Sequence, residues 1–585
     1  MNHLSDKHDQ PGAKGSPPVN VNSHGGGSPE INRRRFLEAA GFTFSLAALH
    51  GCSRPGPEVA LPLIDQPEGL IPGKTQTYAS TCAGCSAGCG LLVGVRDGRP
   101  LKMEGMPEHP LSKGGLCAVG QALPLGLYDS HRLQHPLLSG KESDWKTVDQ
   151  RITKKLKEIA DSGGAVRFVT PTVTSPTLQA SIDQFLKRFK DARHITFDSV
   201  SSSAIPDAHE KTHGSRVLPH YLFDRAKVIV SFGADFLGTW ISPVEFTAAW
   251  RTGRVPTPEH PEMSYHAHFE GQMTLTGSNA DRRFRVAPDE FGAVLNHVYV
   301  RLAEKAGDSS DQPQSALPIP EADLTALVDR LWNARGECLV ICDSQDVAVQ
   351  IVVNAVNHLL GNYDKTLDIA RPSRQRQGND ADVLELVDDL KGEKVSALFV
   401  AGTDLTHNLP DRDNLAKAIE KVDLVVSLAE REDDFASLAG FVCPDQHVLE
   451  TWLDAEPISG LVSLSQPLMQ PLGPNRSILE SLARWSGSDD SAYDILRKSW
   501  ESSIMPRAKG NEKAFREFWD QSVHDGFVEV ETGVADAAKA SDASPDDVKL
   551  PKHLASSATD ADYCLTLYSR IGLTDSRHAH NPWLQ

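Results

Sequence analysis

The chain has 585 residues, a formal net charge of −19, 40% hydrophobic residues and 23% charged residues. A chain of this length and composition can bury several ordinary cores, which argues against a fibrous or wholly disordered protein. The acidic balance and the absence of long Lys or Arg runs argue against binding to nucleic acid phosphates. No stretch reaches the ~18 consecutive apolar residues that a membrane-spanning helix needs, so we expect any membrane association to come from an anchor or a partner.

The first residues predict an export signal. Residues 1–31 are polar, and residues 33–37 (R-R-R-F-L) precede a short apolar run over residues 39–49. This combination is typical of twin-arginine signals, the alternative being an ordinary helix start after a disordered tail. Cys52 ends a sequence similar to a lipoprotein cleavage box, so a lipid-modified Cys52 and an unmodified one both stay open. We expect a signal over residues 1–52, a linker over residues 53–75 and a location at the periplasmic face of the membrane.

Four of the nine cysteines lie close together in the sequence. They are spaced C-x2-C-x3-C-x27-C, at Cys82, Cys85, Cys89 and Cys117. Three thiolates on one tight loop with a fourth from a distance favour a [4Fe-4S] cluster, which takes four Cys ligands. Gly84, Gly88 and Gly90 allow the loop to curl so that its N–H groups point inward. A zinc site and two disulfides are the alternatives.

The remaining thiols and one serine are assigned no chemistry. Beyond the quartet and Cys52, the chain carries Cys338, Cys342, Cys443 and Cys564, which are scattered in mostly apolar surroundings and are expected in the core. Residues 84–88 match G-x-S-x-G, but a nucleophile elbow needs a strand before it and a long helix after it. Because cysteines and glycines surround Ser86, we do not expect acyl transfer.

From Trp145 onward, short β-branched runs alternate with amphipathic helical patterns, which is typical of doubly wound α/β domains. Strands are predicted over residues 166–169, 194–197, 228–232, 339–341, 398–400 and 424–427. Helices are predicted from the apolar spacing over residues 148–159 and from Ser175 and Pro176, which suit an N-cap and a first helical position. Ligands bind at strand ends in such sheets, and the absence of G-x-G-x-x-G disfavours a nicotinamide cofactor.

Several segments resemble one known family. The cysteine quartet followed by Gly120, Gln121 and Ala122, and then by Leu127, Tyr128, Asp129, Arg132, Leu133 and Pro136, resembles the cluster domain of the molybdopterin oxidoreductase superfamily, the formate dehydrogenase and dimethyl sulfoxide reductase group. Residues 145–149, 233–240 and 354–362 match further positions of that group. Residues 226–246, 450–471 and 575–585 are most similar to the molybdopterin-like half of the iron–sulfur subunit of alternative complex III. The resemblance covers essentially everything after residue 30.

The resemblance implies the fold class and the domain organisation. We expect an α/β protein in which a small N-terminal iron–sulfur domain precedes two doubly wound α/β domains, one inserted in the other, and in which most of the C-terminal lid domain is missing. The expected segments are residues 76–136 for the [4Fe-4S] domain, 137–200 plus 372–475 for the first α/β domain, 201–371 for the inserted domain, 476–531 for a helical segment, 532–562 for a linker and 563–585 for the start of the truncated C-terminal domain.

Three departures from the family pattern put a molybdenum site in doubt. Active members carry Lys or Arg two residues after the fourth cysteine, where this chain has Val119, which can supply neither a hydrogen bond nor a charge. The region that would hold the molybdenum ligand, residues 198–203, offers Asp198 and serines in an uncertain register. Without a lid domain, two bound nucleotide diphosphates would face water.

The resemblance therefore implies an oxidoreductase-family electron-transfer subunit in an exported, quinol-oxidising respiratory complex. Its implied partners are a ferredoxin-like iron–sulfur subunit, a polytopic quinol-binding membrane subunit and a multihaem cytochrome c. Its cofactor would be the [4Fe-4S] cluster on Cys82, Cys85, Cys89 and Cys117, and no catalytic residue is assigned. The alternatives are an active molybdenum or tungsten bis-pterin guanine dinucleotide enzyme and a cluster-free scaffold.

Overall fold

The computed structural model describes residues 71, 73–258, 261–308, 316–509, 514–533, 550–551, 554 and 565–585. The predicted signal over residues 1–52 with Cys52, most of both predicted linkers and Cys564 lie outside these residues. Within the part of the chain that the structure describes, no helix combines the length and the hydropathy needed to cross a membrane.

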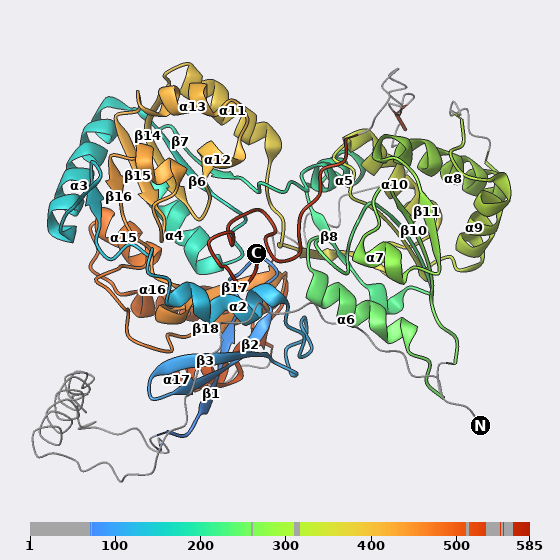
Figure 1. Cartoon of the computed structure of the whole chain (residues 1–585), viewed down its shortest axis with the longest axis horizontal. Coiled ribbons are helices and arrows are strands. Elements are labelled where there is room, and N and C mark those ends of the chain that lie inside the picture. The colour runs from blue at the N-terminus through green and yellow to red at the C-terminus, as the bar shows by residue number, and fades with distance from the viewer. Residues whose placement is uncertain are drawn as a thin grey trace, which may run out of the picture. The chain divides into compact units, whose positions relative to one another are not determined.

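The N-terminal domain is a three-stranded antiparallel sheet followed by a helix (Figure 1). Its elements are β1 (Gln76–Thr81), β2 (Gly90–Arg96), β3 (Arg99–Gly105) and α2 (Ala118–Leu127). Leu91, Val93 and Val95 alternate along β2 and are buried, as the two-residue period of a half-buried strand requires. The sheet therefore anchors both ends of the loop that joins β1 to β2.

The first α/β domain contains a seven-stranded sheet in the order β5-β4-β16-β15-β14-β6-β7. Its strands are β4 (Leu137–Leu138), β5 (Lys141–Glu142), β6 (Ala165–Thr170), β7 (Ala192–Thr196), β14 (Val395–Ala401), β15 (Leu424–Leu428) and β16 (Phe441–Val442). The five strands from β16 to β7 are parallel. Between β6 and β14 the order in which the chain adds strands switches from one side of the sheet to the other. The four strands predicted for this domain are confirmed, with β7 ending one residue earlier than expected.

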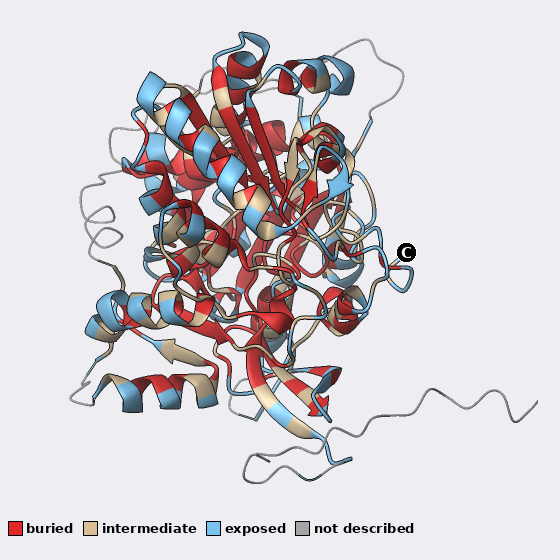
Figure 2. Cartoon of the chain, turned by 90° about the vertical axis from the view of Figure 1, so that its left-hand side faces the viewer, coloured by how far each residue is buried: buried red, intermediate tan, exposed pale blue. Residues whose placement is uncertain are grey.

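Helices cover both faces of this sheet, which gives the doubly wound arrangement. The helices are α3 (Trp145–Ser162), α4 (Pro176–Leu186), α11 (Asp380–Lys391), α12 (Leu405–Asn408), α13 (Arg412–Ile419), α14 (Asp434–Leu438) and α15 (Ile478–Trp485). Residues of α3, α4 and α15 share one core with the sheet, and residues of α11, α13 and α14 share another. Ser175 caps α4 as predicted, because its side chain accepts a hydrogen bond from the N–H of Leu178 at 2.9 Å. Figure 2 shows the buried strands between helices whose outer faces are exposed.

The inserted domain holds a four-stranded parallel sheet in the order β11-β10-β9-β12. Its strands are β9 (Val228–Phe232), β10 (Tyr265–Glu270), β11 (Arg282–Arg285) and β12 (Cys338–Cys342). Its helices are α5 (Ala204–His213), α6 (Pro243–Arg254), α7 (Leu275–Asn279), α8 (Phe291–Ala306), α9 (Glu321–Asn333) and α10 (Val347–Leu359). The strands predicted over residues 228–232 and 339–341 are confirmed. In this sheet the order in which the chain adds strands switches sides between β9 and β12.

A fourth sheet, which the sequence analysis does not anticipate, is antiparallel and has the order β19-β18-β17-β13-β8. Its strands are β8 (Leu218–Tyr221), β13 (Leu367–Ser373), β17 (Leu453–Ile458), β18 (Leu461–Ser465) and β19 (Phe527–Glu529). β8 lies in the inserted segment and β13 at its end, whereas β17 and β18 lie between β16 and α15 of the first α/β domain in the chain. The sheet therefore joins segments that are distant in the sequence.

The prediction of a purely helical segment over residues 476–531 is wrong at its end. The segment contains α15, α16 (Ala492–Ser499), a π-helical turn (Trp500–Ile504) and α17 (Phe515–Asp525), and it then forms β19 against β18. A three-residue strand is too short to show a period in the sequence, and only its long-range partner makes it a strand. Short 3-10 turns complete the described structure at Phe223–Arg225, Pro288–Glu290, Val448–Glu450 and Met505–Arg507.

Candidate metal centre

The four predicted ligand cysteines line one cavity. Cys82, Cys85 and Cys89 lie on the loop between β1 and β2, and Cys117 is the residue before α2. The loop is closed by a hydrogen bond from the N–H of Cys82 to the carbonyl oxygen of Cys89 at 2.8 Å. All four thiols are free of disulfides. The fold thus brings together the residues whose sequence spacing suggested a cluster.

Two glycines make the curl of this loop feasible. A Cβ at Gly84 would stand 2.7 Å from Cγ1 of Val119 and 3.5 Å from Sγ of Cys82, so a larger residue would push on the cavity wall. Gly88 has φ of +65°, a conformation that costs a residue with a Cβ free energy. The loop can therefore curl around the cavity only with small residues at these positions.

The buried cysteines lose their protons only if a positive charge nearby stabilises the thiolates. Burial raises the pKa of Cys82, Cys85 and Cys89, and repulsion from neighbouring quartet thiols adds to the rise. Bound iron lowers thiol pKa values strongly, so four buried thiols around one cavity match the donor set of a [4Fe-4S] cluster. Among the described residues, no three His, Cys, Asp or Glu side chains are placed to bind one metal ion. This agrees with a [4Fe-4S] cluster, because each of its four thiolates binds a different iron atom.

Val119 occupies the wall between the cysteine cavity and a neighbouring cleft. It is 5% exposed and lies on the first turn of α2, and it lines both hollows. The position that carries Lys or Arg in active family members is therefore an apolar contact in this chain.

Asp198 and the serines after it are engaged in local hydrogen bonds. The carboxylate of Asp198 accepts from the N–H of Thr172 at 2.8 Å, from its hydroxyl at 2.5 Å and from the N–H of Gly378 at 3.1 Å. The hydroxyls of Ser201 and Ser203 donate to Asp380 and Asp207 at 2.7 Å and 3.0 Å. Asp198 does line the cysteine cavity, but a metal there would compete with three existing donors.

Two larger clefts open at the carboxyl ends of the parallel strands. The first has a volume of about 740 Å³ and is lined by residues that follow β14 and β15. The second has a volume of about 780 Å³ and is lined by residues that follow β9, β10 and β12. Both volumes fall in the range of small-molecule sites, and both clefts lie where open α/β sheets bind ligands. The fold therefore has two ligand-sized hollows at its strand ends.

Carboxylates are the main charged residues of the first cleft, whereas three carboxylates and two arginines line the second. The first cleft is lined by Asp404, Glu430, Glu432, Asp433, Asp434 and Asp445, and the second by Asp235, Glu270 and Asp343. Burial raises the pKa of Asp433 to about 6 and the pKa values of Asp445 and Asp343 to about 7. These three carboxyls are therefore partly protonated near pH 7, and the other carboxylates of the first cleft are the ones that repel an anionic diphosphate, so that cleft fits a pterin dinucleotide poorly.

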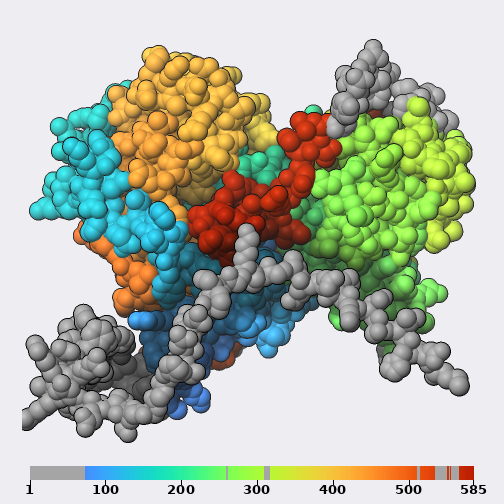
Figure 3. Space-filling view, in the orientation of Figure 1, coloured from blue at the N-terminus to red at the C-terminus, as the bar shows by residue number. Residues whose placement is uncertain are grey.

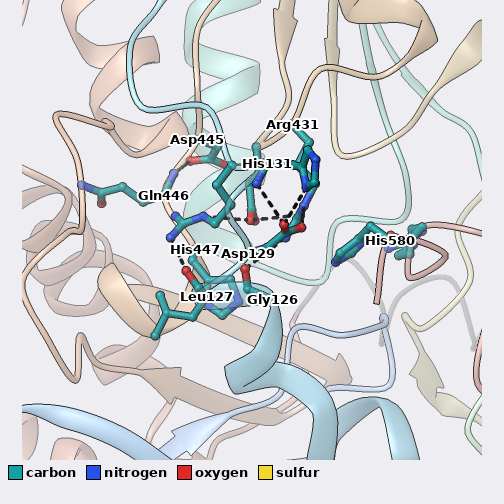
Figure 4. A network of polar contacts seen from close by, with 12 residues as sticks. Gly126, Leu127, Asp129, His131, Arg431, Asp445, Gln446, His447 and His580 are labelled. Atoms are coloured by element: carbon teal, nitrogen blue, oxygen red, sulfur yellow. Dashed lines mark hydrogen bonds and ion pairs between the residues drawn. The ribbon is translucent and has the colours of Figure 1, made fainter. Parts of the chain in front are cut away.

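The cations of the first cleft are largely neutralised (Figure 4). Arg431 donates to Asp129 at 2.7 Å and to the carbonyl oxygen of Gly126 at 3.0 Å. Burial lowers the pKa of the neighbouring His447 to about 3, so this imidazole is neutral. This network ties the end of α2 to the loop after β15.

The C-terminal residues 565–585 lie across the cysteine cavity and both clefts (Figure 3, red). Nε2 of His578 lies 2.6 Å from the carbonyl oxygen of Gly84, and Arg577 pairs with Asp575 at 2.5 Å. Arg577 and Arg376 both line the cysteine cavity, and neither was singled out from the sequence. Only the family-like ending over residues 575–585 gave a signal for this segment.

Comparisons with known proteins agree with this architecture. The sequence profile of the molybdopterin oxidoreductase Fe4S4 domain matches residues 75–129. The menaquinone reductase molybdopterin-binding-like subunit of Nitratidesulfovibrio vulgaris is 24% identical over 478 residues, which span 72% of this chain and 66% of that protein. The structure of acetylene hydratase from Pelobacter acetylenicus superposes with a TM-score of 0.57 at 14% identity, covering 79% of this chain and 76% of that one. Over residues 75–129 the chain matches the Fe4S4 domain of molybdopterin oxidoreductases, and over most of its length it is similar in sequence and fold to proteins of that superfamily.

Proposed function

We propose that this chain is the iron–sulfur subunit of an exported, membrane-associated, quinol-oxidising respiratory complex similar to alternative complex III. In this proposal Cys82, Cys85, Cys89 and Cys117 hold a [4Fe-4S] cluster that carries single electrons. The pterin-binding fold is retained as a scaffold for partner subunits. The observation that carries the proposal is the convergence of the four cysteines on one cavity beside the aliphatic Val119.

The relative's printed name supports a link to quinones. The Nitratidesulfovibrio vulgaris protein is named as a subunit of a menaquinone reductase. That name describes electron flow toward the quinone, whereas the resemblance to alternative complex III implies flow from the quinol. The proposed partners are a ferredoxin-like iron–sulfur subunit, a polytopic quinol-binding membrane subunit and a multihaem cytochrome c. To decide the direction of electron flow, the assembled complex is mixed with a menaquinol or with a menaquinone. The absorbance of the cytochrome haems then shows whether they become reduced or oxidised.

The acidic clefts support a scaffold without molybdenum. Asp404, Glu432 and Asp434 line the first cleft, and Asp235 and Glu270 line the second. A bis-pterin cofactor brings two nucleotide diphosphates to these walls, where like charges repel. The second candidate, an active molybdenum or tungsten enzyme, is favoured by the size of the two clefts and by their place at the strand ends.

Metal analysis tests the proposal. We expect protein purified without oxygen to contain about four iron atoms per chain, with the broad absorbance near ~400 nm of such clusters and no stoichiometric molybdenum or tungsten. One molybdenum or tungsten per chain with extractable pterin would establish the second candidate instead. Iron-free protein that still assembles with its partners would establish a cluster-free scaffold.

Export forms a separate part of the proposal. The twin-arginine sequence includes Arg33 and Arg34, and Cys52 is the proposed lipid anchor. Replacement of both arginines by Lys should keep the protein in the cytoplasm. Replacement of Cys52 by Ala should leave export intact and release the chain from membranes stripped of its partners. Unchanged location of the double Lys variant would contradict the export route.

A further inference from the structure

A buried iron–sulfur cluster needs nearby positive charge. Four thiolates make the whole site negative, and reduction adds one more negative charge in a medium of low dielectric constant. In this chain the residue two positions after Cys117 is Val119, which is 5% exposed and uncharged. Any side-chain positive charge at the cluster therefore comes from other parts of the fold.

Two arginines line the same cavity as the cysteines. Arg376 follows β13, and its guanidinium donates to the hydroxyl of Ser86 inside the cysteine loop and to the carbonyl oxygen of Gln375 at 3.0 Å. Arg577 reaches the cavity from the C-terminal segment. Both guanidinium-bearing residues therefore lie along the wall of the cavity that the four thiols share. A positive charge at this wall stabilises negative charge on the thiolates and on a cluster that they hold.

The C-terminal segment holds Arg577 beside the cysteine loop. The next residue, His578, is 2.6 Å from the carbonyl oxygen of Gly84, and the side chain of Asn581 donates to the carbonyl oxygen of Ala122 at 3.4 Å. Asp575 forms an ion pair with Arg577 at 2.5 Å and lines the same cavity. The charge of Arg577 is therefore fixed in place but partly offset by one carboxylate.

We propose that Arg577, together with Arg376, sets the reduction potential of the cluster by supplying the positive charge that Val119 lacks. Arg577 is a positioning residue in this scheme, because it acts on the cluster through the field at Cys85 and makes no bond to iron. The inference rests on the proposed cluster. It adds that the C-terminal segment is part of the electron-transfer site.

The test is a redox titration of the full chain followed by electron paramagnetic resonance. Arg577→Gln should lower the reduction potential, because it removes a positive charge that favours the reduced state. Arg577→Lys keeps the charge and should restore most of the potential. Asp575→Asn removes the offsetting carboxylate and should raise the potential. Arg570→Gln, an exposed arginine of the same segment, is the matched control and should leave the potential unchanged.

The opposite signs separate an electrostatic role from a structural one. If the substitutions acted by damaging the fold, the reduction potentials of Arg577→Gln and Asp575→Asn would shift in the same direction, and Arg577→Lys would not restore the potential. Equal potentials in the wild type, Arg577→Gln and Asp575→Asn, all with full iron content, would overturn the inference and leave the proposed function standing. If Arg577→Gln does not bind iron, the reduction potentials of Arg577→Lys and Asp575→Asn test the inference instead. Iron-free wild-type protein would overturn both proposals.

Discussion

Arg132 and Glu450 form a two-pronged ion pair that is almost entirely removed from solvent. Nη1 and Nη2 of Arg132 lie 3.2 Å and 2.6 Å from the two carboxylate oxygens of Glu450, and the side chains are 1% and 0% exposed. Nη1 also donates to the carbonyl oxygen of Leu127 at the end of α2, and Glu450 accepts from the N–H of Leu472. The pair therefore connects the cluster domain to the turn before β17.

Replacement of one partner of this pair should destabilise the protein. Glu450→Gln leaves the buried guanidinium of Arg132 with only the more distant carboxylate of Glu430, whose Oε2 lies 3.8 Å from Nε. Loss of the close partner should cost up to about 3–5 kcal/mol in the free energy of unfolding. The exposed pair of Lys227 and Glu337, at 2.8 Å, provides the matched control. Glu337→Gln should cost below about 1 kcal/mol, since water screens exposed pairs. Urea denaturation of both variants measures the difference, and equal losses would contradict the role of burial.

Loss of one cysteine of the quartet should remove the cluster. Cys85→Ser replaces a thiolate by a hydroxyl that does not ligate iron well, so iron content and the absorbance near ~400 nm should fall to background. Docking of partner subunits should weaken as well. The control is Cys443→Ser, because Cys443 is buried in the core of the first α/β domain and away from the quartet. Full iron content in Cys85→Ser would refute the ligand assignment.

A methyl group at Gly84 should disturb the cavity, and a smaller residue at position 119 should repair it. The Cβ of Gly84→Ala would come within 2.7 Å of Cγ1 of Val119, which the structure does not accommodate without a shift. We expect reduced iron retention in Gly84→Ala and recovery in the double variant with Val119→Ala, which lacks that atom. Gly440→Ala meets its first neighbour at 3.9 Å and serves as control. Iron measured per chain in the four proteins tests the contact, and an unrepaired double variant would rule it out as the cause.

Acid should destabilise the fold through buried neutral histidines. His109 is 0% exposed and lies 3.0 Å from the hydroxyl of Ser463, and burial lowers its pKa to about 4. The unfolded chain has a His pKa of about 6.5, so between these values the unfolded state binds a proton that the native state does not. Stability contributed by His109 is therefore complete above pH ~6.5 and is lost as the pH falls toward 4, by about 2 kcal/mol at pH 5.

His109→Gln tests this dependence. The variant keeps a hydrogen-bonding group and cannot take up the proton, so its loss of stability between pH 7 and pH 5 should be smaller than that of the wild type by about 2 kcal/mol. Urea denaturation at the two pH values gives both losses. The exposed His524, replaced in the same way, should leave the dependence as it is in the wild type. Parallel pH profiles for the wild type and His109→Gln would contradict the assignment.

Local patterns predicted six of the parallel strands, missed β10, β11 and β16, and did not predict the five-stranded antiparallel sheet. The strand over residues 228–232 agrees with β9 at both ends, because five consecutive buried positions between breaks are visible in the sequence. β8 and β19 have four and three residues, and their partners β13 and β18 are distant in the chain. A strand of that length carries no readable period, so only its pairing defines it.

The sequence by itself determined which cysteines are candidate cluster ligands and which family the chain resembles, because the spacing of Cys82, Cys85, Cys89 and Cys117 and the motifs around it are local and unusual. Only the tertiary structure decided what surrounds those sulfurs. His578 lies 494 residues from Gly84 in the chain, yet their atoms are in hydrogen-bonding contact. Arg376 and Arg577 are also far from Cys85 in the sequence. Their charges act on it because electrostatic interactions depend on distance in space, which the tertiary structure sets.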